Sequence, residues 1–220
     1  MPDESKSKPK FDWPGWSCVL GVLGIISVLV VPPILRQQKQ ADLAEAISNA
    51  RSFGLALVEF DGEYKTFPND STAIRVMEGS DSSFDVSGTS SNRLFRQLFA
   101  GNLTQSEVSF YAKIPGTHKP DGIVTPTEAL KKGEVGFSYI SGLSSKDDPA
   151  TPLVLTPLIP GTTTFDPEPF NGKAIVLQID CTVKVYSIQK DGHIYRDGID
   201  LLSQKQPIWK GKAPDIRYPE

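Results

Sequence analysis

The side chains best suited to chemistry in this sequence are acidic residues in turn-rich loops. Asp147 and Asp148 stand together in a loop of residues 144–151, which also offers hydroxyl and carbonyl oxygens. Calcium takes about 6–8 oxygen ligands of these kinds. We therefore expect Asp147 and Asp148 either to bind calcium or, since their spacing matches no defined calcium loop, to belong to a solvated turn. A second acidic group consists of Asp191, Asp197 and Asp200.

The sequence predicts no catalytic residue. His118 and His193 each follow turn residues and lack an acidic or cysteine partner at ligand spacing, which favours exposed loop histidines. Residues 142–146, Gly-Leu-Ser-Ser-Lys, lack the final glycine of a nucleophile elbow. Phosphate-binding loops, zinc-protease helices and EF-hand spacings are also missing. We expect a protein that is not an enzyme and that holds no cofactor besides, at most, calcium.

Composition and charge place the chain among ordinary globular proteins with a single core. It has 220 residues, of which 39% are hydrophobic and 22% charged, and a formal net charge of −3. No run of Lys and Arg could follow a phosphate backbone, so nucleic acid is not an expected partner. The two cysteines, Cys18 and Cys181, belong to different parts of the chain, and we expect them to be unpaired small apolar side chains.

An uncharged segment near the start of the chain predicts a membrane anchor. Residues 13–35 contain no Asp, Glu, Lys or Arg, and about 20 such residues cross ~30 Å of hydrocarbon as a helix. A cleaved signal peptide would need a small-x-small site after the apolar run, but Pro-Pro-Ile-Leu-Arg stands at 32–36. We expect a single transmembrane helix that stays attached and contacts membrane lipid.

The flanks of this segment indicate its orientation. We expect residues 1–12 to be a polar tail, too short to bury a core. This tail has three lysines, whereas two basic residues, Arg36 and Lys39, closely follow the uncharged segment. The positive-inside rule then favours a cytoplasmic N-terminus, with the rest of the chain across the inner membrane in the periplasm.

Two glycines in the anchor predict a contact between helices. Gly21 and Gly24 leave little side chain on the surface of the helix. Small residues let transmembrane backbones approach closely. We therefore expect Gly21 and Gly24 to form the face through which the anchor meets other helices.

Residues 36–60 predict an amphipathic continuation of the same helix. Apolar and small residues recur there at helical spacing, at Leu43, Ile47, Ala50, Gly54, Leu57 and Val58. The prolines at 32 and 33 predict a kink where the helix leaves the membrane, because neither has an N–H to donate. The second half of the helix should pack on a globular head.

Residues 61–206 predict that head, with an α+β fold. Ser71 and Asn92 stand where two short helices would begin. Further along, short apolar runs separated by Gly and Pro favour an antiparallel sheet of about four to six strands. The clearest hairpin joins 174–179 to 183–188. The strand-like runs are 108–112, 135–140, 152–158, 173–180, 182–188 and 193–197, and 207–220 reads as an extended tail.

The order of these parts resembles the type II secretion pseudopilins and related prepilin-type proteins, in particular the general secretion pathway protein G-like members. The resemblance covers residues 15–68 and includes the helix end Ala-Arg-Ser-Phe-Gly-Leu-Ala-Leu at 50–57 and Tyr-Lys-Thr-Phe-Pro at 64–68. It implies a pilin-like fold, in which a long N-terminal helix packs on a C-terminal antiparallel sheet. It also implies a structural role in a type II secretion or type IV pilus-like assembly. The implied partners are other pilin-like subunits or inner-membrane secretion components, bound through the N-terminal helix.

Two marks of the family are missing. Family members are cut after a Gly, before a Phe, and carry a Glu shortly afterwards within the apolar helix. If Gly15-Trp16 is the junction, Leu20 stands at the Glu position; if Pro32 is aligned with the family proline, Lys10-Phe11 is the junction and the Gly is absent. A chain without both marks also fits a membrane-tethered periplasmic binding module that uses the pilin-like scaffold but does not polymerise. An anchored enzyme that uses its loop carboxylates is a further alternative.

Overall fold

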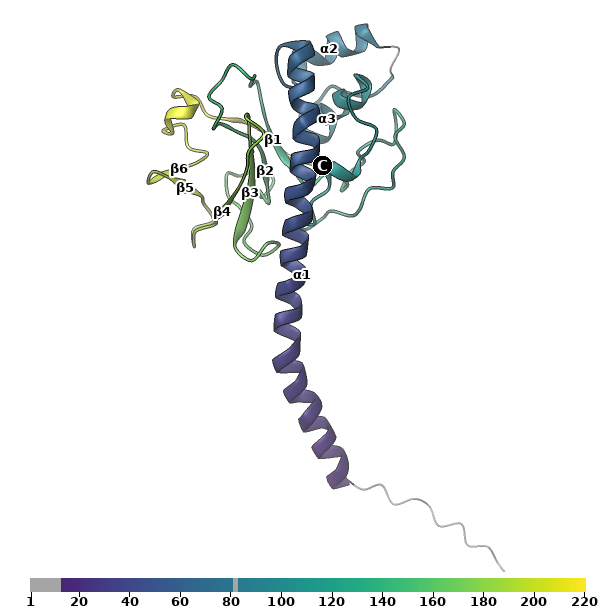
Figure 1. Cartoon of the computed structure of the whole chain (residues 1–220), viewed down its shortest axis with the longest axis vertical. Helices are drawn as coiled ribbons and strands as arrows, with labels where there is room; N and C mark the ends of the chain where they lie inside the picture. Colours follow the sequence, from purple (N-terminus) through teal and green to yellow (C-terminus); the bar gives the residue numbers. More distant parts are fainter. Residues whose placement is uncertain (1–12, 81–82) are drawn as a thin grey trace, which may run out of the picture. The chain divides into compact units, whose positions relative to one another are not determined.

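The computed structural model describes the backbone of residues 13–80 and 83–220, and the side chains of 34–80 and 83–220 (Figure 1). The chain divides into two compact units, residues 1–38 and 39–220. The second unit is an α+β head with helices and an antiparallel five-stranded sheet. The predicted α+β class is therefore confirmed, together with an N-terminal helix.

The predicted anchor falls almost wholly outside the described side chains. Only the last two residues of 13–35 are among them, and Gly21, Gly24 and the tail 1–12 are not. In the part of the chain that the structure describes, no helix has a stretch long and apolar enough to cross a membrane. The anchor and its glycine contact remain predictions from the sequence.

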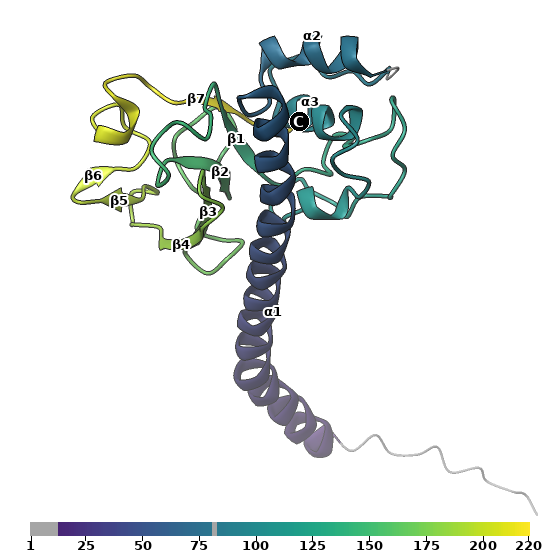
Figure 2. The ribbon, with the colours of Figure 1, turned by 45° about the horizontal axis from the view of Figure 1, so that its top comes forward.

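The sheet has the strand order β4-β3-β2-β1-β7, with every neighbouring pair antiparallel (Figure 2). β3 and β4 form the predicted hairpin, and β7, from within the predicted tail, pairs with β1 at the sheet edge. A separate hairpin joins β5 to β6. The strands are β1 Ser138–Ser141, β2 Pro152–Thr156, β3 Lys173–Gln178, β4 Val183–Ser187, β5 Tyr195–Arg196, β6 Ile199–Asp200 and β7 Asp215–Arg217.

Helix α1, Trp13–Tyr64, supplies one wall of the head's core from Lys39 onward. It contains no proline after Pro33, and its Ala and Leu residues favour a helix. One stripe, spaced by four and three residues, is buried: Ala46, Ala50, Phe53, Leu57 and Phe60. Val58, which the apolar pattern assigned to this face, is instead 42% exposed. Adjacent positions on a helix point about 100° apart, so Val58 turns away when Leu57 faces the core.

Two further helices cover the same core, α2 Asp70–Gly79 and α3 Ser91–Ala100. Their N-caps are Asn69 and Ser90, so Ser71 and Asn92, which the sequence predicts as caps, are each two residues too late. Asn69 and Thr72 form a reciprocal capping box, in which each side chain accepts the other's backbone N–H. A capping residue stands just before the first helical turn, as Asn69 and Ser90 do here.

The predicted strand at 108–112 is not a strand. Its first three residues form the short 3-10 helix η1, Val108–Phe110, and a second, η2, covers Pro207–Trp209. Phe110 and Ala112 are buried, as an apolar run requires. Phe110 packs against the rings of Phe53, Phe95 and Phe99, and the segment reaches this position without pairing to a neighbouring strand.

The sheet separates two apolar layers. Alternate residues of β3 enter each of them: Ile175 and Leu177 join the layer beneath α1, and Ala174 and Val176 join the other. The second layer is covered by side chains of the C-terminal segment, including Leu201, Leu202 and Trp209. The central strands are therefore buried on both faces.

An aromatic cluster joins α1 to the rest of the first layer. The ring of Phe53 lies between three others, with centroid distances of 5.4 Å to Phe95, 5.1 Å to Phe110 and 5.2 Å to Phe137. All four rings are buried. Because these residues come from α1, α3, η1 and the approach to β1, the cluster connects four segments of the head.

A close crossing of two backbones precedes β1 at Gly136. Its N–H donates to the carbonyl of Phe110 at 3.0 Å, and its carbonyl accepts the Thr156 hydroxyl at 2.7 Å. A Cβ added to Gly136 would lie 2.6 Å from the backbone nitrogen of Ala112 and 2.7 Å from its Cβ. Residue 136 therefore has room only for glycine.

Candidate functional site

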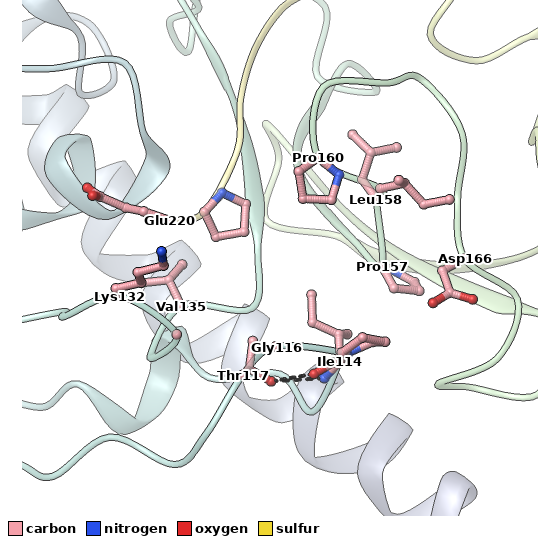
Figure 3. Close-up of a pocket in the computed structure, with 14 residues that line it drawn as sticks. Ile114, Gly116, Thr117, Lys132, Val135, Pro157, Leu158, Pro160, Asp166 and Glu220 are labelled. Carbon is pink, nitrogen blue, oxygen red and sulfur yellow. Dashed lines mark hydrogen bonds between the residues drawn. The ribbon is translucent and has the colours of Figure 1, made fainter.

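A pocket opens among loops of the head, near residues 115, 133, 158 and 219 (Figure 3). Its volume of about 340 Å³ lies at the small end of the range for ligand sites, ~300–1,000 Å³. Val135 and Leu158 are buried apolar residues of its lining. The remaining apolar lining consists of Ile114, Ile159, Pro115, Pro157, Pro160 and Pro219.

Charged side chains border this pocket on different sides. Figure 3 shows Lys132 and Glu220 on one side and Asp166 on the other. The Glu220 side chain already accepts hydrogen bonds from the Ser90 hydroxyl at 2.6 Å and from Arg93 Nε at 3.4 Å. Within the described residues, neither Lys132 nor Asp166 has an ion-pair partner.

Three carboxylates that stand 13 and 14 positions apart in the sequence meet elsewhere in the head. Glu107, Asp121 and Glu134 each bring one oxygen to within 4.8 Å of the others, and the two glutamates are buried. Carboxylate oxygens are ligands that suit a hard cation such as calcium. These residues, rather than Asp147 and Asp148, are the acidic group in the described chain whose geometry could hold a metal ion.

The same oxygens already hold a loop in place. Glu107 accepts the N–H groups of Leu130 at 2.6 Å and Gly122 at 3.1 Å. Glu134 accepts those of Lys131 at 2.6 Å and Asp121 at 3.2 Å. The two buried glutamates therefore hold both ends of segment 121–131, which contains no helix or strand. This structural role accounts for their burial without an ion.

Burial also changes how these acids titrate. Desolvation raises the pKa of the Glu107 carboxyl above its ordinary value, and the nearby Glu134 and Asp121 carboxylates raise it further, although the Leu130 and Gly122 N–H groups act against this. The pKa of Asp121 is lowered, first by the Ile123 N–H and then by the Lys131 ammonium. The buried acid thus holds its proton to a higher pH than the exposed one.

The raised pKa of Glu107 predicts a pH-dependent contribution to stability. A group whose folded pKa lies above its unfolded value makes folding most favourable below the unfolded pKa, near 4.5, and that contribution is lost as the pH rises through the folded pKa. Across this window, the 39–220 fragment should therefore lose stability relative to its Glu107→Gln variant. Urea unfolding of both proteins between pH 4 and about 7 measures the difference. A difference that stays constant over this range would contradict the assignment.

The predicted calcium residues form turns. Asp147 accepts the N–H of Ser144 at 3.1 Å, and its other oxygen lies 3.4 Å from the Lys210 ammonium. Asp148 accepts the N–H of Ala150 at 2.8 Å. In the structure both side chains therefore stabilise loop 144–151 by accepting backbone N–H groups, as acidic residues commonly do in turns.

The histidines lie in loops, as do Asp191 and Asp197 of the second acidic group, whereas Asp200 ends strand β6. Both ring nitrogens of His118 lie 3.2 Å from backbone carbonyls, those of Lys119 and Lys132. His193, expected to be exposed and without an acidic partner, is instead half-buried, and its Nδ1 lies 2.9 Å from an Asp200 oxygen, away from the line of a good hydrogen bond. Asp191 accepts the hydroxyl of Tyr195 at 2.7 Å. Asp197 lies 3.8 Å from Arg196 Nε.

No protein-family model, curated protein or solved structure matches this chain.

Proposed function

We propose that the protein is a membrane-anchored, pseudopilin-like structural subunit of a type II secretion or type IV pilus-like assembly, with a periplasmic head and no catalysis of its own. The order of an uncharged N-terminal segment, an amphipathic helix and an α+β head supports this function. The observation that carries it is a second stripe on α1, which faces away from the core of the head.

This outer stripe follows the spacing of helix–helix contact positions. Its members recur alternately every three and four residues, and every one is exposed: Ala41, Ala44, Ser48, Arg51, Leu55, Val58 and Gly62. That 3.5-residue period is typical of coiled-coil contacts. Four of the seven are Ala, Ser or Gly, which allow close approach, and Leu55, 68% exposed, and Val58 would gain apolar burial. In an assembly of such subunits, this face would be buried against the helix of a neighbour.

The tethered binding module is the second candidate. The pocket of Figure 3 favours it, since a concave apolar site with unpaired charges is a feature that binding proteins use. In that case the protein would act alone, and the outer stripe of α1 would remain in contact with solvent.

Cysteine cross-linking in membranes distinguishes these two functions. In a full-length background with Cys18→Ser and Cys181→Ser, Ser48→Cys and Leu55→Cys should each form disulfide-linked dimers on mild oxidation, because the stripe brings equivalent positions together. Lys184→Cys, on exposed strand β4, serves as the control and should remain monomeric. The readout is a non-reducing gel of membranes washed with alkaline carbonate, from which the anchored protein should not be released.

The predicted glycine face supplies the second arm of the test. Gly21→Leu with Gly24→Leu should leave the protein in the washed membranes, since leucine is favourable in lipid, and should reduce the Leu55→Cys dimer severalfold. Equal cross-linking at 55 and 184 would remove the assembly argument and leave the tethered binding module. Release of the full-length protein by carbonate would contradict both candidates.

A further inference from the structure

The pocket of Figure 3 offers few free hydrogen-bonding groups. Prolines form much of its lining, and proline has no N–H. The Thr117 hydroxyl is already bonded to carbonyls of its own turn, at 2.9 Å to Ala112 and 2.8 Å to Ile114. The backbone N–H groups of Gly133 and Ile159 donate to the carbonyls of Glu220 and Thr164. A ligand would therefore find most polar atoms of the lining engaged.

Two charged groups of the lining are not engaged in this way. Lys132 is exposed and its ammonium has no partner in the described chain. Asp166 uses one oxygen to accept the Glu168 N–H at 2.9 Å, and its other oxygen is free among the described groups. The two residues lie on different sides of the pocket in Figure 3, so its free ammonium and its free carboxylate oxygen stand apart. The Glu220 side chain, on the side of Lys132, is held by Ser90 and Arg93.

We propose that this pocket binds a short apolar peptide with free termini, its carboxylate toward Lys132 and its ammonium toward Asp166. The chemistry of the lining matches each part of such a ligand. Rigid apolar walls suit aliphatic side chains, the ammonium of Lys132 suits an anion, and the free oxygen of Asp166 suits a cationic donor. A simple carboxylic acid would leave Asp166 unused, and a simple amine would leave Lys132 unused. This proposal is independent of helix packing by α1.

Peptide titrations of the full-length protein in lipid nanodiscs test this assignment. The probes are di-, tri- and tetrapeptides of leucine, each with free termini, and the readouts are calorimetry and the NMR signals of the Val135 and Leu158 methyl groups. At least one length should bind and shift both signals. The same peptide with an acetylated N-terminus and an amidated C-terminus should bind several times more weakly.

Matched substitutions assign each end of the ligand. Lys132→Gln and Asp166→Asn should each weaken binding by about two- to fivefold, the range for partly exposed ion pairs. Asn retains the oxygen that accepts the Glu168 N–H, so the loop should keep its structure, which thermal unfolding can verify. Lys146→Gln removes an exposed lysine outside the pocket and should leave the affinity unchanged.

A double-mutant cycle between ligand and protein decides the orientation. The C-terminally amidated peptide should bind wild type and Lys132→Gln equally, while the N-acetylated peptide should be insensitive to Asp166→Asn. Equal binding of the free and doubly blocked peptides would overturn the proposal and leave only an apolar site, and so would an absence of binding at every length. Affinity that depends on the termini but is unchanged in both variants would place the site outside this pocket and would also overturn it.

Discussion

Phe53→Ala should destabilise the 39–220 fragment by about 3–5 kcal/mol, the usual cost of removing a buried aromatic ring. The substitution empties the centre of the cluster in which Phe53 contacts the rings of Phe95, Phe110 and Phe137. These partners belong to separate segments, so none can move into the space without disturbing its own packing. Urea unfolding, followed by circular dichroism, gives the difference in free energy.

Leu55→Ala provides the matched control, two residues away on the same helix. Leu55 is 68% exposed on the face opposite the core, so its truncation should change the free energy of unfolding by at most ~0.5 kcal/mol. Similar losses for the two variants would mean that α1 does not pack on the head through the Phe53 face. The same pair separates folding from assembly, because Leu55 belongs to the proposed subunit contact and Phe53 does not.

Gly136→Ala should be about as damaging, at roughly 3 kcal/mol or more, although it adds a single methyl group. That methyl would enter the space of the Ala112 backbone, which cannot rotate away as a side chain could. Relief requires the two crossing segments to separate, with loss of the hydrogen bond from Gly136 to Phe110. Thermal unfolding of the fragment should show a drop of many degrees in Tm.

Gly62→Ala is the control for this prediction, since it makes the same change in open space. Gly62 lies in α1, and a Cβ there would meet nothing within 4 Å. Alanine favours helices over glycine by up to ~1 kcal/mol, so this variant should be unchanged or slightly more stable. Destabilisation by both substitutions would show that the loss at 136 is not caused by the crossing.

Local pattern predicts the type of element well in this chain, and its boundaries less well. The hairpin of β3 and β4 follows from two apolar runs separated by a turn, and in the structure Leu177 pairs with Val183. The strand predicted at 108–112 was wrong because a buried segment need not be a strand. Its residues fill space beside Phe53, and no strand lies there to pair with them. The predicted helix starts were wrong because the capping residues, Asn69 and Ser90, stand just before the helices.

The candidate sites could not be predicted from local spacing. Glu107 and Glu134 are isolated acids in the sequence, and only the folded loop brings them beside Asp121. The Lys132 and Asp166 pair likewise depends on loops that meet across the head. Asp147 and Asp148 were candidates for calcium ligands because they are adjacent in the sequence. Adjacent acidic residues are also common in turns, and both side chains accept backbone N–H groups there. Chemistry assembled from distant segments leaves no such local sign.

The position of β7 has a consequence for the order in which the head folds. The β3–β4 hairpin can form as soon as its own residues are available, because its contacts are local. β1 pairs on one side with β2 and on the other with β7, which is far away in the sequence. Until residues 215–217 have been synthesised, one row of backbone donors and acceptors on β1 has no strand to pair with. An unpaired edge of this kind is a template for association with other chains. Heads in which β7 has not yet docked are therefore vulnerable to aggregation through the edge of β1, and docking of β7 protects them.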